Sequence, residues 1–160
     1  TAAALTGLAA TRDPRALPLL LDHTKWGVHQ NARRAATVSL GALAPYLDEA
    51  GRTRVRERLE ELLEDRWLRV QLSAVAALET LGDPRSIGAL RSAGERALEG
   101  RITRTARVAI RRIGEAQERS AEVRGLKEEL ERLQQANQKL TDRMTTLEAR
   151  LPSPSGRRRG

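Results

Sequence analysis

The chain has 160 residues, of which 31% are charged, and its formal net charge is +8. Aromatic residues make up 2% and phenylalanine is absent, so a core must be packed from small aliphatic side chains, as in stacked helices. The lack of cysteine excludes disulfides and thiolate metal sites and agrees with the cytoplasmic location that we expect. No apolar run is long enough to cross a membrane, and no signal peptide opens the sequence.

The first predicted helix covers residues 2–10. Its pattern is that of the inner helix of a repeated helix pair, with the beginning of that helix missing. We therefore expect the chain to be a fragment whose upstream part is missing. An outer helix follows and ends near Asp22; Asp13 can cap its exposed amides and Pro14 fits its first turn. A long connection, residues 23–30, leads to the next unit.

Two longer helices are predicted next. An inner helix covers residues 31–43 and is broken by Pro45, and a charged helix covers residues 48–65. The charged helix ends in a run of carboxylates that we interpret as a solvated face rather than a catalytic pair. This run comprises Glu60, Glu61, Glu64 and Asp65.

The clearest helix of the sequence covers residues 67–81. Apolar side chains, Trp67 among them, recur on two of its sides, so the helix must be sandwiched between neighbours. Its small residues Ala74 and Ala77 would allow those neighbours to approach closely.

A sharp turn should follow this helix. Gly82 suits the left-handed position after a helix, Asp83 can cap the next helix, and Pro84 fits its first turn. The outer helix that begins there is predicted to run through Leu98.

The same pattern recurs along the chain. Copies of it lie about 70 and about 38 residues upstream, and its helical half returns about 32 residues downstream. Self-similarity at this period predicts an all-α solenoid of stacked antiparallel helix pairs over residues 1–114, with about three and a half units. The Leu-Gly-Asp-Pro-Arg run at residues 81–85 makes this region resemble HEAT repeats.

A closer resemblance rests on the Thr-Lys-Trp-Gly segment at residues 24–27 and the Asn-Ala-Arg-Arg-Ala-Ala segment at residues 31–36. Together with the helix start at Gly100 and Arg101, these segments resemble the C-terminal HEAT-like domain of bacterial M1-family zinc aminopeptidases. The resemblance implies a missing upstream catalytic domain that holds the zinc. The HEAT-like domain would pack on it and shape peptide access.

The chain itself has no His-Glu-x-x-His motif, so we expect no catalytic residue, no metal site and no enzyme activity in it. His23 and His29 lie in one connection without further ligands, and we interpret both as surface residues.

Beyond residue 114 the periodicity narrows to a single apolar seam, which predicts a long coiled-coil helix over residues 115–151. Leucines occupy the d positions of its heptads, and Asn137 occupies an a position, where a buried amide favours two parallel strands in register. We expect a parallel homodimer; the alternative is a helix folded back on the solenoid. The predicted seam comprises Val123, Leu126, Leu130, Leu133, Asn137, Leu140, Met144, Leu147 and Leu151. The basic tail, residues 152–160, is predicted to be disordered.

A basic stripe on the last repeat helix is the other candidate surface. It comprises Arg101, Arg104, Arg107 and Arg111. Such a stripe could hold phosphates, but no aromatic residues are interleaved with it, so the sequence does not favour nucleic acid. A solvated or interdomain face fits better.

Three functions follow in order of preference. The first is the non-catalytic C-terminal domain of an M1-type zinc aminopeptidase, with its own catalytic domain as partner. The second is a standalone HEAT scaffold that binds a protein on its concave face and dimerises through the coiled coil. The third is a basic HEAT protein that binds nucleic acid.

Overall fold

The computed structural model describes residues 2–150, which form α-helices joined by short turns and contain no β-strand. The chain divides into two units, Thr1–Gln117 and Glu118–Gly160. The predicted disordered tail and the last seam residue, Leu151, lie outside the described residues. Within those residues, no helix combines the length and apolar character that crossing a membrane requires.

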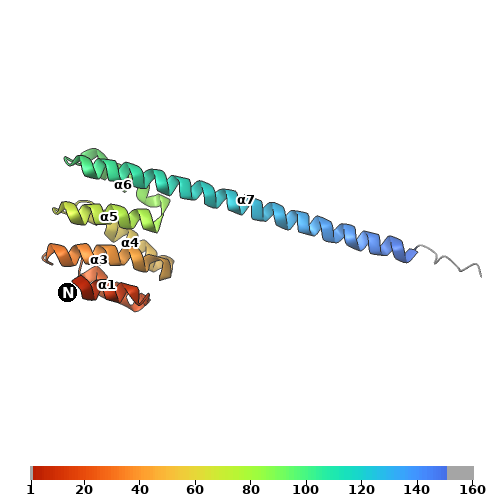
Figure 1. Cartoon of the computed structure of the whole chain (residues 1–160), viewed down its shortest axis with the longest axis horizontal. Helices are drawn as coiled ribbons and strands as arrows, with labels where there is room; N and C mark the ends of the chain where they lie inside the picture. The colour runs from red at the N-terminus through yellow and green to blue at the C-terminus, as the bar shows by residue number, and fades with distance from the viewer. Residues whose placement is uncertain (1, 151–160) are drawn as a thin grey trace, which may run out of the picture. The chain divides into compact units, whose positions relative to one another are not determined.

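The first unit is built on a row of inner helices that lie side by side (Figure 1). These are α1 (Ala2–Ala10), α3 (Gln30–Leu43), α5 (Leu68–Leu81) and the first turns of α7 (Gly100–Arg150). The outer helices α2 (Leu17–Asp22), α4 (Glu49–Leu62) and α6 (Ile87–Arg96) connect successive inner helices. A 3₁₀ turn precedes each outer helix. Pro14–Ala16 leads directly into α2 and Pro84–Ser86 directly into α6, whereas two residues separate Ala44–Tyr46 from α4. This arrangement confirms the predicted all-α solenoid.

The turns between helices have the predicted chemistry. Gly82 follows α5 in the left-handed conformation, with φ of 67°, and donates its backbone N–H to the Leu78 carbonyl. The Asp83 carboxylate accepts a hydrogen bond from the Arg85 backbone N–H at 2.9 Å. Asp13 makes the same 2.9 Å bond to Arg15 in the first repeat, so both Asp-Pro-Arg segments begin their helices in one way.

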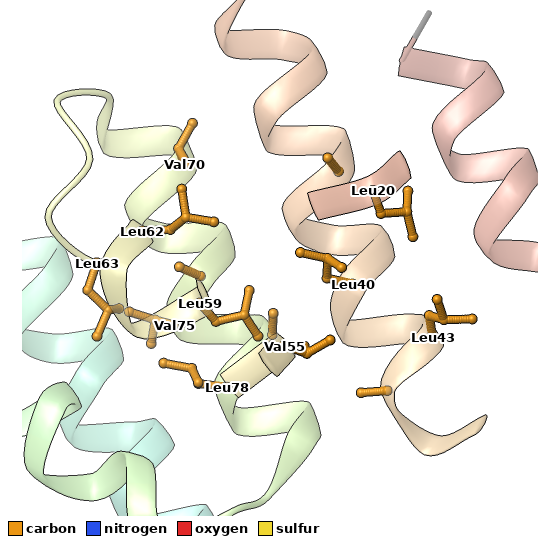
Figure 2. Packing of buried hydrophobic residues seen from close by; sticks show 14 of the residues in the cluster. Leu20, Leu40, Leu43, Val55, Leu59, Leu62, Leu63, Val70, Val75 and Leu78 are labelled. Atoms are coloured by element: carbon orange, nitrogen blue, oxygen red, sulfur yellow. The ribbon is translucent and has the colours of Figure 1, made fainter. Parts of the chain in front are cut away.

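The core of the unit is aliphatic and runs continuously from one repeat to the next (Figure 2). Leu40 of α3, Leu59 of α4 and Leu78 of α5 have no exposed surface. The inner helices approach closely where their residues are small: a Cβ built on Gly41 would lie 2.9 Å from the Ala77 Cβ. Small residues therefore set the spacing between α3 and α5, as the alanine pattern predicted.

Three boundaries differ from the sequence prediction. Helix α4 ends at Leu62, so Asp65 lies in the following turn. Trp67 precedes α5 in extended conformation and is 38% exposed rather than part of the apolar helical face. Helix α6 ends at Arg96, and Leu98 is fully exposed because the chain must reverse there to begin α7.

In the second unit, α7 continues to Arg150 without a break at Gly125. Every residue from Glu118 through Arg150 is exposed. Helices in water are stabilised mainly by packing of an apolar face, and residues 118–150 have no such packing.

Candidate interaction surfaces

The predicted seam lies along one exposed stripe of α7. Its large apolar side chains are between 51% and 62% exposed. The residues are Val123, Leu126, Leu130, Leu133, Leu140, Met144 and Leu147. Asn137, in the middle of the stripe, is exposed as well. A row of this length is much larger than the scattered apolar residues of an ordinary surface, and it indicates an interaction surface.

A second candidate surface lies between two inner helices of the first unit. Arg34 and Val38 of α3 and Arg69, Leu72, Ser73 and Ala76 of α5 line a shallow groove of about 430 Å³. Val38, on the rim of the groove, is 49% exposed.

The arginines of the outer helices and turns are mostly paired with carboxylates. Arg56 bonds Glu60 at 2.7 Å, and Arg96 bonds Glu64 at 2.6 Å. Arg85 bridges Asp83 and Glu49, at 2.7 and 2.9 Å. The exposed pair Arg96–Glu64 should stabilise the fold by only about 0.2–1 kcal/mol. Together, these pairs balance much of the positive charge on the outer surface.

The four arginines of the predicted basic stripe of α7 have different surroundings in the structure. All four of its arginines are exposed. Arg107 lines a hollow of about 530 Å³ between α6 and α7, together with Arg91 and Glu95. Arg111 lies 3.7 Å from Glu115 on its own helix. Neither Arg101 nor Arg104 has a carboxylate within 4.0 Å among residues 2–150.

The interpretation of the acidic run was wrong for its last member. Asp65 is 1% exposed, and its carboxylate contacts the guanidinium of Arg33, which is also 1% exposed. The other Asp65 oxygen accepts a hydrogen bond from the Trp67 backbone N–H at 2.9 Å. Asp65 is buried because α4 has already ended and the turn brings it beneath α3. It is therefore a structural residue that links two repeats.

The surroundings of Arg33 explain two residues of the long connection after α2. The Trp26 ring covers the Arg33 guanidinium, 4.6 Å from the ring centre. Arg58 of α4 donates to the Thr24 hydroxyl and to its carbonyl, both at 2.8 Å. Burial, and then the nearby charges of Arg58 and Arg66, lower the pKa of Arg33 below its ordinary value.

One feature of the sequence could have predicted that Arg33 is buried. It lies three residues before Ala36 and seven before Leu40, on the apolar side of α3. A charged residue on that side needs a buried partner of opposite charge.

The two histidines have local roles. His29 caps α3, and its Nδ1 accepts a hydrogen bond from the Asn31 backbone N–H at 3.3 Å. The Nδ1 of His23 lies 2.9 Å from the Leu19 carbonyl oxygen. In the part of the chain that the structure describes, no three side chains of His, Cys, Asp or Glu are grouped to hold a metal ion.

Comparison with protein families identifies one segment. Residues 70–93, from the first turn of α5 into α6, match the model of the PBS lyase HEAT-like repeat. The solenoid is HEAT-like. No curated protein matches the chain significantly.

The matched segment contains the left-handed Gly82, the Asp83 cap and the buried helix α5. The first repeat contains the same turn, with Arg12 in the left-handed position and Asp13 as the cap. Stacked units of this kind present extended surfaces to other proteins. The comparison therefore supports a helical repeat scaffold.

Proposed function

We propose that the chain is a non-catalytic, dimeric scaffold. Two copies join through the second unit, and the HEAT-like repeats of each copy bind a partner protein with their inner helices. The observation that carries this proposal is the row of exposed apolar side chains along α7 from Val123 to Leu147, which only Asn137 interrupts.

The pattern within the row supports a second copy of the chain as its occupant. The d positions are all leucine, and each leucine that becomes buried contributes roughly 1.5–3 kcal/mol. In a parallel homodimer, Glu122 would face Lys127 and Arg143 would face Glu148, and no like charges would face one another at the other two such positions. Asn137 would pair with its own copy and favour two strands over three or four.

A cysteine cross-link tests the dimer and its orientation together. The natural chain has no cysteine, so Val123→Cys introduces one thiol at an a position of the seam. In a parallel pair the two thiols come within disulfide range, and mild oxidation should give a covalent dimer on a non-reducing gel. Ala121→Cys, two residues away on the opposite side of the helix, should not cross-link.

Two results would contradict the proposal. A Val123→Cys chain that stays a monomer in solution excludes the dimer and favours a helix folded back on the repeats. A chain that dimerises without forming the disulfide excludes the parallel arrangement.

The M1 aminopeptidase assignment is a second candidate, and it rests on the resemblance of residues 24–36. Two residues of this segment have packing roles within the repeats. The Trp26 ring covers the Arg33 guanidinium, and the Thr24 hydroxyl accepts a hydrogen bond from Arg58. These contacts account for the segment without a catalytic domain, which is why we favour the scaffold. The coding sequence upstream of Thr1 tests the assignment: a His-Glu-x-x-His motif would support it, and further repeats would contradict it. The expected lack of bound zinc, the lack of enzyme activity and the cytoplasmic location stay predictions.

A further inference from the structure

The inner helices α3 and α5 and the first turns of α7 contain more arginines than acidic residues. Helix α3 contains no Asp or Glu, and α5 contains Glu79 alone. The first acidic residue of α7 is Glu115, near the end of the first unit. Glu79 is itself engaged by Arg112, so it does not balance the arginines of the groove. The outer surface differs, because many of its arginines, among them Arg56, Arg85 and Arg96, have carboxylate partners.

The repeat interval indicates that the side of α5 that lines this groove has a counterpart on α7. The downstream repeat interval of about 32 residues places Arg101, Arg104 and Val108 where α5 has Arg69, Leu72 and Ala76. Contacts between the two helices agree with this register. Arg112 reaches Glu79, and the Gln117 side-chain amide donates to the Gly82 carbonyl at 3.1 Å.

We name this surface the inner basic face. It comprises the arginines Arg34, Arg69, Arg101 and Arg104 and the apolar residues Val38, Leu72, Ala76 and Val108. Among residues 2–150, none of the four arginines has a carboxylate within 4.0 Å. Their guanidinium groups are therefore available to a ligand.

The two kinds of residue point to one kind of ligand. Planar guanidinium groups bind carboxylates through paired hydrogen bonds, and the apolar strip between them offers contact to aliphatic side chains. Nucleic acid fits less well, because α3, α5 and the described part of α7 contain no aromatic side chain on which a base could stack. We propose that the inner basic face binds an acidic segment of a partner protein, in which aliphatic residues stand between aspartates or glutamates. This inference rests on the proposed scaffold function and names the chemistry of its partner.

Selection from a library of random 12-residue peptides displayed on phage tests the inference with the full chain as bait. Recovered peptides should be rich in Asp and Glu and contain Leu, Ile or Val between them. A chain with Arg34→Gln, Arg69→Gln and Arg104→Gln should bind the same peptides about tenfold more weakly, since each of the three lost pairs costs about twofold. Binding to the parent should also weaken as salt is raised.

A matched variant controls for the change in net charge. Arg52, Arg54 and Arg91 are exposed arginines of the outer helices α4 and α6, and changing all three to glutamine removes the same charge from the other surface. This variant should bind the selected peptides within about twofold of the parent. Circular dichroism should show that both variants keep the helix content of the parent.

The possible outcomes separate the inference from the proposed function. Neutral or basic peptides, or acidic ones that bind both variants equally, would overturn the inference and leave a protein-binding scaffold in place. If no peptide is recovered, protein binding by the repeats fails as well. If a 20-nucleotide single-stranded DNA binds more tightly than any peptide and loses affinity only in the inner-face variant, the ligand is nucleic acid and the inference is wrong.

Discussion

At the scale of single residues, Arg33 and Asp65 show that an alanine-rich repeat can bury a charged pair. Both side chains are almost fully buried, and Trp26 covers the guanidinium from the solvent side. Replacing such a pair by apolar residues is often neutral, whereas removing one partner leaves an uncompensated charge in the core. The pair therefore makes the two repeats depend on one another.

We expect Asp65→Asn to lower the free energy of unfolding by about 3–5 kcal/mol, because the Arg33 charge would stay buried without a counter-charge. Urea denaturation would measure the change. Glu64→Gln is the matched control: Glu64 is the exposed neighbour of Asp65 and pairs with Arg96 at 2.6 Å, so its loss should cost under about 1 kcal/mol. Equal effects of the two substitutions would mean that the Arg33–Asp65 pair is not buried.

Gly41 sets the distance between α3 and α5. Replacing glycine by alanine inside a helix usually stabilises by about 0.5–1 kcal/mol. Here the added methyl would lie 2.9 Å from the Ala77 Cβ, so Gly41→Ala should instead destabilise by roughly 1–3 kcal/mol. Gly88→Ala in α6 meets no atom within 4 Å and should show the usual gain. Thermal unfolding compares the two variants, and a stabilised Gly41→Ala chain would show that the helices can separate at no cost.

At the scale of elements, the two Asp-Pro-Arg turns begin outer helices in the same way. The Arg85 side chain, by hydrogen bonding to Asp83, holds the pKa of that carboxyl below its ordinary value, and Arg15 does the same for Asp13. A carboxyl whose pKa is lower in the folded state stabilises the fold above about pH 4. That contribution is lost as the pH falls from about 4 through the folded-state pKa.

Asp83→Ala should therefore cost about 1 kcal/mol at neutral pH. The difference between parent and variant should shrink as the pH falls below about 4, because the parent carboxyl then becomes protonated. Asp83→Asn, which keeps an acceptor for the Arg85 N–H, should retain much of the cap and lack this pH dependence. Denaturation at several pH values would test the account, and a difference that does not change with pH would contradict it.

Periodicity was sufficient to predict most elements. The apolar spacing of α3 and α5 and the Gly82–Asp83–Pro84 turn were predicted from sequence, because these features depend on residues a few positions apart. The burial of Asp65 could not be predicted in this way, since it depends on contact with Arg33 in another repeat. The exposed turn at Leu98 was missed because the apolar spacing of α6 continues through it.

The two candidate surfaces also differ in whether the sequence alone predicts them. The seam of α7 is a local pattern on one helix and is visible in the sequence. The inner basic face is not, because Arg34 and Arg69 join Arg101 and Arg104 only when the repeats are stacked. The spacing in the sequence instead grouped Arg101 and Arg104 with Arg107 and Arg111, which have different surroundings in the structure.

At the scale of the whole molecule, we propose that the two units have separate tasks. The first unit buries its own aliphatic core, so it should fold without a second copy. The second unit exposes all its described side chains and, in this account, acquires a core only by pairing. Loss of pairing should therefore leave the repeats folded.

The molar mass in solution decides whether two copies of the chain pair through the second unit. Light scattering at tens of micromolar should give twice the chain mass of 17.7 kDa for the parent and for Gln135→Glu, a change outside the seam. Leu133→Glu places a charge at a d position and should give the mass of one chain, while circular dichroism still shows a cooperative unfolding transition of the repeats. A parent chain with the mass of a monomer, or a Leu133→Glu chain that stays dimeric, would contradict the account.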